Sequence, residues 1–174
     1  MDKLQLRMSN TDTISEQMQI YVNGIVNRWT SELDANMRVI SEHLRVAVVD
    51  DVTLQSWVLN LANTLYFSLE GLEKVGIKED VCRHIREEVF IDARKVASGT
   101  VKDRDGEALL ACTNEDMITI IYSRAYKTIK QKVDAGYEML NSIKKVMSKR
   151  MTEDELSNSR FINIQTERRS RRDG

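Results

Sequence analysis

The chain contains no proline in 174 residues and only seven glycines. Average usage would give about eight or nine prolines in a chain of this length. Because proline and glycine are the residues that most disfavour a helix interior, their scarcity permits long, uninterrupted helices. Hydrophobic residues make up 41% of the chain and charged residues 30%. This composition provides enough apolar mass for the core of one domain and is not typical of a disordered chain.

Apolar residues recur at steps of three or four in four segments, which is the period of an amphipathic helix. These stripes, which include Leu33, Leu61 and Ile129, are expected to face the core. The first segment opens with a capping-box pattern at 13–16, and Asp50 with Asp51 marks a second helix start. Gly76 and Gly99 are expected to end helices. The pattern predicts helices near 13–46, 51–75, 78–98 and 114–150.

Short connections between the first three segments predict an all-α, antiparallel up-down four-helix bundle with long first and fourth helices. The bundle domain is expected over 13–151, between an N-terminal arm (1–12) and a C-terminal arm with a basic tail (152–174). Polarity alternates with period two at 3–8 and 160–165, so both arms are expected to be short extended segments. The outer helices have longer apolar stripes than the inner ones, which predicts a homo-oligomer or another protein partner.

Three glycines fall inside the predicted helices, namely Gly24, Gly71 and Gly136. Each costs about 1 kcal/mol relative to alanine in a helix interior. Close approach of a neighbouring helix is one reason to keep them. Tolerance by a long, well-packed bundle is the other, and the sequence leaves both open.

Four carboxylates are candidates for a metal site: Glu70, Glu73, Glu88 and Asp92. They loosely resemble the paired acidic motifs of all-α nucleoside triphosphate pyrophosphohydrolases, which hold magnesium between antiparallel helices. The last pair is spaced E-x-x-x-D where that family has E-x-x-D. Counted outward from the expected turn at Gly76, Glu88 and Asp92 also lie one to two helical turns from the position opposite Glu70. Solvated or locally paired carboxylates are the favoured interpretation, although Asp92 projects onto the apolar face of its helix.

Other chemistry finds little support. Cys82 and Cys112 form no disulfide framework or zinc motif, the two histidines belong to no nucleophile motif, and no phosphate-binding glycine loop occurs. We therefore expect no catalytic residues, no metal and no cofactor. Residues 1–7 lack the apolar run of a signal peptide and no stretch has the composition of a membrane span. A cytoplasmic protein without membrane contact is expected.

Charge is divided unevenly along the chain. Residues 1–123 hold 13 Lys/Arg and 20 Asp/Glu, and residues 124–174 hold 13 and 7. The net charges are therefore −7 and +6, which sum to the overall −1. A basic stripe with a basic tail is typical of a surface that binds phosphate groups. The alternative is a solvated helix face whose positive charges balance the acidic helices of the same bundle. The nucleic-acid candidates are Arg124, Lys127, Lys130, Lys145, Lys149, Arg168, Arg169, Arg171 and Arg172.

The second predicted helix carries more apolar residues than one core-facing stripe requires. Val52, Leu59 and Tyr66 recur every seven residues beside the stripe, and Phe67 adjoins them. Two interpretations remain open, a widened core face or a protein interface.

We therefore expect a non-enzymatic helical-bundle interaction module, such as an adaptor, scaffold subunit or accessory factor, that forms oligomers. The alternative is a nucleic-acid-associated accessory protein that uses the fourth helix and the arginine tail. An all-α metal-dependent nucleotide hydrolase is the third hypothesis.

Overall fold

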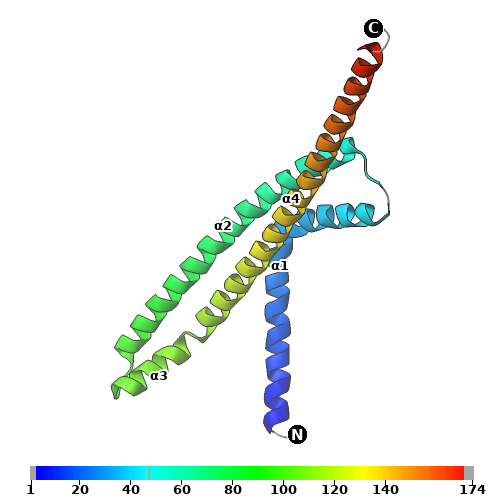
Figure 1. The fold of residues 1–174 in the computed structure, drawn as a ribbon. Coiled ribbons are helices and arrows are strands. Elements are labelled where there is room, and N and C mark those ends of the chain that lie inside the picture. The colour runs from blue at the N-terminus through cyan, green and yellow to red at the C-terminus, as the bar shows by residue number, and fades with distance from the viewer. Residues whose placement is uncertain (1–2, 47, 171–174) are drawn as a thin grey trace.

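The structure, a computed structural model, describes the backbone of residues 3–46 and 48–170 and the side chains of 10–45 and 48–157. Within these ranges the chain forms four α-helices and no strand. They are α1 (Lys3–Val46), α2 (Asp51–Val96), α3 (Val101–Ala111) and α4 (Thr113–Ser170) (Figure 1). The all-α class is confirmed. The described helices number four, as predicted, but α2 spans two of the predicted helices and α3 forms where no helix was predicted.

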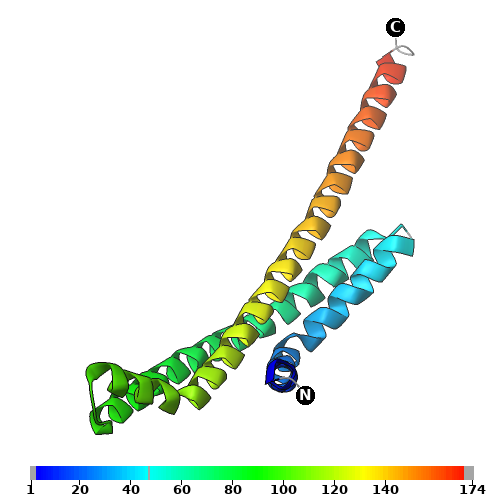
Figure 2. The same cartoon turned by 90° about the horizontal axis from the view of Figure 1, so that it is seen from below.

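Three of the helices are long and one is short. α2 and α4 lie side by side as an antiparallel hairpin, and α3 lies at its closed end (Figures 1 and 2). α1 packs on this hairpin from Val22 to its C-terminal end, whereas its first turns lead away from the hairpin. The C-terminal part of α4 extends past the α1–α2 connection (Figure 2). The core is therefore a three-helix layer with a helical extension at each end of the chain.

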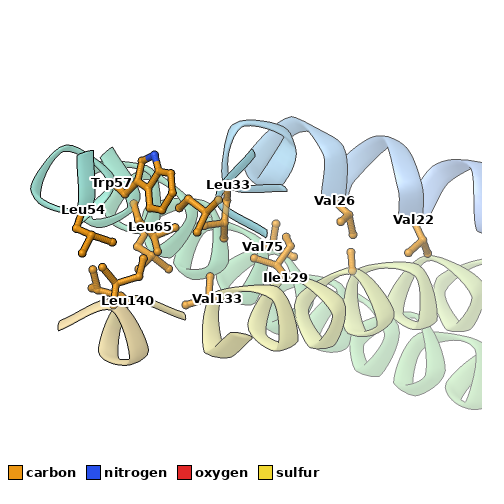
Figure 3. Close-up of a cluster of buried hydrophobic side chains, with 14 residues drawn as sticks. Val22, Val26, Leu33, Leu54, Trp57, Leu65, Val75, Ile129, Val133 and Leu140 are labelled. Carbon is orange, nitrogen blue, oxygen red and sulfur yellow. The ribbon is translucent and has the colours of Figure 1, made fainter. Parts of the chain in front are cut away.

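The core follows the apolar stripes that the sequence pattern indicates. Figure 3 shows Val26 and Leu33 of α1 facing α2 and α4, with Leu65 and Ile129 among the side chains that fill the space. All four are at most 3% exposed. The buried cluster also includes Val22, Ile40, Leu54, Trp57, Leu61, Val75, Ala125, Val133, Leu140 and Ile143.

Helix ends lie where capping chemistry predicts them around α2 and α3. The Asp50 carboxylate accepts hydrogen bonds from the backbone N–H of Thr53, at 2.8 Å, and from its hydroxyl, at 2.9 Å. These bonds hold the pKa of Asp50 below its usual value of 3.8. Gly99 has φ +106°, a backbone conformation that favours glycine. Thr100 and Asp103 then form a capping box that starts α3.

The expected break at Gly76 is wrong, because α2 continues through it as one helix of 46 residues. Val75 is 2% exposed, and the next inward position, Glu79, is also buried. A Cβ on Gly76 would lie 3.2 Å from Tyr126 of α4. The two predicted segments therefore share one face that α4 covers, and this packing outweighs glycine's helix penalty.

The expected extended arms are also wrong. Residues 3–12 belong to α1 and residues 152–170 to α4. Extending an existing helix fixes one residue per added hydrogen bond, whereas six alternating residues are too few to form a stable ribbon alone. Residues 1–2 and 171–174 lie outside the described chain.

The bend of α1 coincides with polar contacts near its middle. The buried Thr30 hydroxyl donates to the carbonyl of Val26 at 3.1 Å, and Ser68 of α2 donates to the carbonyl of Trp29 at 2.9 Å. Threonine back-bonding and an inserted hydroxyl both perturb the helical ladder. The bend therefore lies where α1 meets α2.

Candidate protein-interaction surfaces

The apolar row predicted on the second helix lies on the outer side of α2. Val52 is 76% exposed, Leu59 71%, Tyr66 68% and Phe67 50%. The rings of Tyr66 and Phe67 contact each other edge-on with centroids 5.7 Å apart. The interpretation of this row as a widened core face is therefore wrong.

This outer surface carries no charge. Residues 52–69 contain no Asp, Glu, Lys or Arg, although charged residues make up 30% of the chain. The exposed side chains between the apolar ones are neutral, as at Gln55, Asn60 and Asn63. A helix facing water normally carries charged and polar residues on its outer side. We call the exposed side of 52–69 the neutral face of α2. The absence of charged residues from 52–69 is the sequence signal for this face, and a search for hydrophobic periodicity alone does not detect it.

A second apolar surface lies where α1 departs from the hairpin. A groove of about 580 Å³ is lined there by Ile20, Gly24 and Trp29 of α1, by Ile77 of α2 and by Tyr122 of α4, with others. Ile20 is 70% and Ile77 57% exposed. We call this feature the α1–α2 groove. Sequence periodicity assigns three of its α1 lining residues, Tyr21, Ile25 and Trp29, to a core stripe, because periodicity does not reveal the bend that separates them from α2.

The edge of the α1–α2 groove is basic. Its charged lining residues are Arg28, Lys74 and Lys78, and no carboxylate lines it. The Lys74 ammonium lies 5.2 Å from the Trp29 ring centroid, and that of Lys78 lies 5.8 Å from the Tyr122 ring centroid. Lys74 also pairs with Glu70 at 2.5 Å, just outside the lining. The groove thus combines an apolar floor with cations held on aromatic rings.

The basic candidates of α4 lie in water. Arg124, Lys127, Lys130, Lys145 and Lys149 are all exposed. Among side chains of the described ranges, only Lys149 of these five has an ion pair, with Glu153 of its own helix at 3.8 Å. Arg168 and Arg169 lie on α4, but their side chains are outside the described ranges, as are Arg171 and Arg172 altogether. The described part of this face is therefore not neutralised by the acidic helices.

The carboxylate candidates are not brought together. Because α2 is continuous, Glu73 and Glu88 lie on one helix, about 22 Å apart along its axis. Asp92 is exposed and pairs with Lys95 at 3.0 Å, and Glu88 lies 3.4 Å from His84. The expectation that Asp92 projects onto a buried face is wrong, because no helix covers that side of α2. Among the described residues, no three His, Cys, Asp or Glu side chains could share a metal ion.

Both cysteines are free thiols in the structure. Cys112 is buried between α3 and α4, and its Sγ lies 3.6 Å from the carbonyl oxygen of Arg86. Partial burial raises the pKa of the Cys82 thiol. A raised pKa lowers the thiolate fraction, so Cys82 lacks the signature of a reactive nucleophile.

None of the helices over the described residues combines the length and apolar character needed to cross a bilayer. Comparisons of the chain with protein-family models, with curated proteins and with solved structures find no match. The neutral face of α2, the α1–α2 groove and the basic side of α4 are therefore the features on which a functional proposal rests.

Proposed function

We propose that the protein is a non-enzymatic helical interaction module whose copies pair through the neutral face of α2. The observation that carries this proposal is a charge-free run, 52–69, with Val52, Leu59 and Tyr66 each more than two-thirds exposed. Contiguous exposed apolar surface is typical of interaction sites. Burying this face removes no charge from water, so association avoids the largest desolvation penalty.

The neutral face is complementary to itself in an antiparallel arrangement. A two-fold axis between Asn60 and Leu61 places the run 52–69 of one copy opposite the same run of the second copy, in reverse order. This register places Leu59 opposite the exposed Ala62 and Tyr66 opposite the exposed Gln55 of the second copy. Such an isologous contact closes at two copies and leaves no unpaired interface.

Sedimentation equilibrium and light scattering of the purified chain test this proposal. We expect a dimer at micromolar concentration. Tyr66→Glu buries a charge within the contact, so the dimer dissociation constant should rise at least 100-fold. The matched control is Leu110→Glu on α3, because Leu110 is 77% exposed and lies away from the neutral face. A monomeric wild-type chain at high micromolar concentration, or a dimer unaffected by Tyr66→Glu, would contradict the proposal.

A second candidate function, association with nucleic acid, is favoured by the unpaired basic residues of α4. Arg124, Lys127, Lys130 and Lys145 are exposed and have no ion pair among the described side chains. Cations free of intramolecular partners are available to phosphates. Asp134 and Glu138 on the same helix reduce the positive electrostatic potential of this side of α4. The dimer module is therefore the first proposal.

Salt-dependent titration with oligonucleotides tests the second candidate. Each phosphate contact adds about 0.9 to the log–log salt slope on duplex and about 0.7 on single strands. Lys127→Glu with Lys130→Glu, and deletion of 167–174, should each lower the slope. Equal, negligible binding by the full chain and both variants would exclude this function.

A further inference from the structure

Gly24 is a helix residue that the packing of the chain does not explain. A Cβ built on it would meet nothing within 4 Å, whereas one on Gly71 would lie 2.6 Å from the Cβ of Trp29. Close helix approach therefore accounts for Gly71 but not for Gly24. Glycine costs about 1 kcal/mol relative to alanine in a helix interior, and nothing within the described chain offsets this cost at Gly24.

The open space beside Gly24 belongs to the α1–α2 groove. Ile20 and Ile77 flank it and are more than half exposed, while Ile25 and Trp29 are partly buried. Because glycine has no side chain, the backbone of α1 itself forms this part of the groove wall. Glycine is typical of sites where another backbone comes close. The shape of the groove therefore indicates a binding partner from outside the monomer.

The charges of the groove indicate what this occupant carries. Arg28, Lys74 and Lys78 are its only charged lining residues, and all three are cations. Lys74 and Lys78 lie over the rings of Trp29 and Tyr122, so part of the rim is ordered before binding. A complementary partner bears carboxylates on either side of an apolar ridge.

We propose that the α1–α2 groove binds an amphipathic helix of a partner protein, with an apolar ridge on the floor and acidic side chains on Arg28, Lys74 and Lys78. Both walls are helices that diverge, and a third helix packs between such walls by placing its ridge in their groove. Anchors at i, i+3 or i+4, and i+7 match the apolar floor of such a groove. The absent side chain at Gly24 allows the partner backbone to come close. This site is separate from the neutral face of α2.

A synthetic probe helix of about 18 residues tests the proposal. The probe has leucine at i, i+3, i+4 and i+7, glutamate on both flanks and no tryptophan, and the control probe has lysine in place of each glutamate. Trp57→Phe leaves Trp29 as the only tryptophan, so its fluorescence reports on the groove. We expect the acidic probe to change Trp29 emission and to bind at least tenfold more tightly than the basic probe.

Two glycine variants separate groove binding from general effects. Gly24→Leu adds to the groove a side chain whose Cβ meets nothing within 4 Å, and it should weaken probe binding at least tenfold. Gly106→Leu is the matched control, because a Cβ on Gly106 of α3 also meets nothing within 4 Å and lies outside the groove. Circular dichroism of both variants should show the helix content of the parent chain.

Three results would overturn the proposal. These are equal affinity for acidic and basic probes, undiminished binding by Gly24→Leu, and a Trp29 response to anionic phosphatidylglycerol vesicles but not to the acidic probe. Binding of the acidic probe by Tyr66→Glu with parent affinity would show that the groove works independently of the neutral face. Its loss in that variant, with helix content retained, would also count against the separate groove.

Discussion

The hydroxyl of Ser68 donates a hydrogen bond to the main-chain carbonyl of Trp29, with 2.9 Å between the oxygens and a separation of 39 positions in the sequence. Ser68 is 1% exposed, and Gly71 one turn later leaves room for the Trp29 side chain. This contact ties α2 to the region where α1 bends. The direction of the N-terminal half of α1, and with it the width of the α1–α2 groove, therefore depends on two small residues of α2.

Alanine at Gly71 and at Gly24 should have opposite effects on stability. Gly71→Ala forces a methyl group against the Cβ of Trp29, and overpacking of this kind costs about 1–3 kcal/mol, which exceeds the gain in helix propensity. Gly24→Ala meets open space and should raise the free energy of unfolding by about 0.5–1 kcal/mol. Urea denaturation followed by circular dichroism measures both. Effects of the same sign would show that the packing at Gly71 is not as described.

The N-cap of α2 should make stability depend on pH. Hydrogen bonds from Thr53 lower the pKa of Asp50 in the folded chain, so its carboxylate stabilises the fold above the unfolded pKa. That contribution is lost as the pH falls through the folded pKa, below 3.8. Asparagine still caps a helix but does not titrate. The difference in melting temperature between the parent chain and Asp50→Asn should be constant above about pH 5 and shrink at lower pH.

The control for this measurement is Asp80→Asn. Asp80 is exposed on α2 and has no hydrogen bond or ion pair among the described residues. Its variant should follow the parent chain across the same pH range. If Asp50→Asn also parallels the parent down to acid pH, the cap carboxylate does not contribute as its hydrogen bonds indicate.

The proposed register of the dimer can be tested by a charge pair. Leu59→Lys alone should abolish pairing, because it places two cations near the centre of an apolar contact. Adding Ala62→Glu in the same chain places each new carboxylate opposite the new ammonium of the second copy. Sedimentation equilibrium should then show dimers again, weakened by added salt. Failure of the double variant to pair, while the parent chain forms dimers, would reject this register but not pairing itself.

The C-terminal extension of α4 should contribute little to the stability of the core. Residues 151–157 are all exposed, and Figure 2 shows this part of α4 beyond the α1–α2 connection. Ending the chain at Ser157 should change the free energy of unfolding by less than about 0.5 kcal/mol. Arg150→Ala should cost more, about 1 kcal/mol, because Arg150 donates to the carbonyl of Val49 at 2.7 Å and to Asp51 at 2.8 Å. Thermal melts distinguish the two variants.

Helix stripes and caps were predictable because they depend on neighbours close in sequence. The apolar period correctly placed Leu33, Leu61 and Ile129 in the core, and Asp50 and Gly99 marked real helix ends. The continuity of α2 through Gly76 was not predictable from local signals. The continuity depends on packing against Tyr126 and the rest of α4, which cover the Gly76 side of α2 but lie far from it in the sequence.

The candidate surfaces were predictable only in part. The row at Val52, Leu59 and Tyr66 was visible as excess hydrophobicity, but its exposure follows from the arrangement of α1 and α4 on the other side of α2. The α1–α2 groove was not visible, because it requires the bend that Ser68 and Thr30 accompany. Gly24 was the one residue there whose cost in a helix indicated something unusual.

α4 is a single helix of 58 residues and therefore extends about 87 Å along its axis. A rod of that length alone has a radius of gyration of about 25 Å, against about 16 Å for a compact domain of this size. A flexible linker of equal length would fluctuate around an end-to-end distance of about 42 Å. The hydrogen-bonded ladder of α4 instead sets one spacing between its two ends. A partner bound near α3 and another bound near the C-terminal end of α4 would thus be held at a distance fixed by the length of this helix.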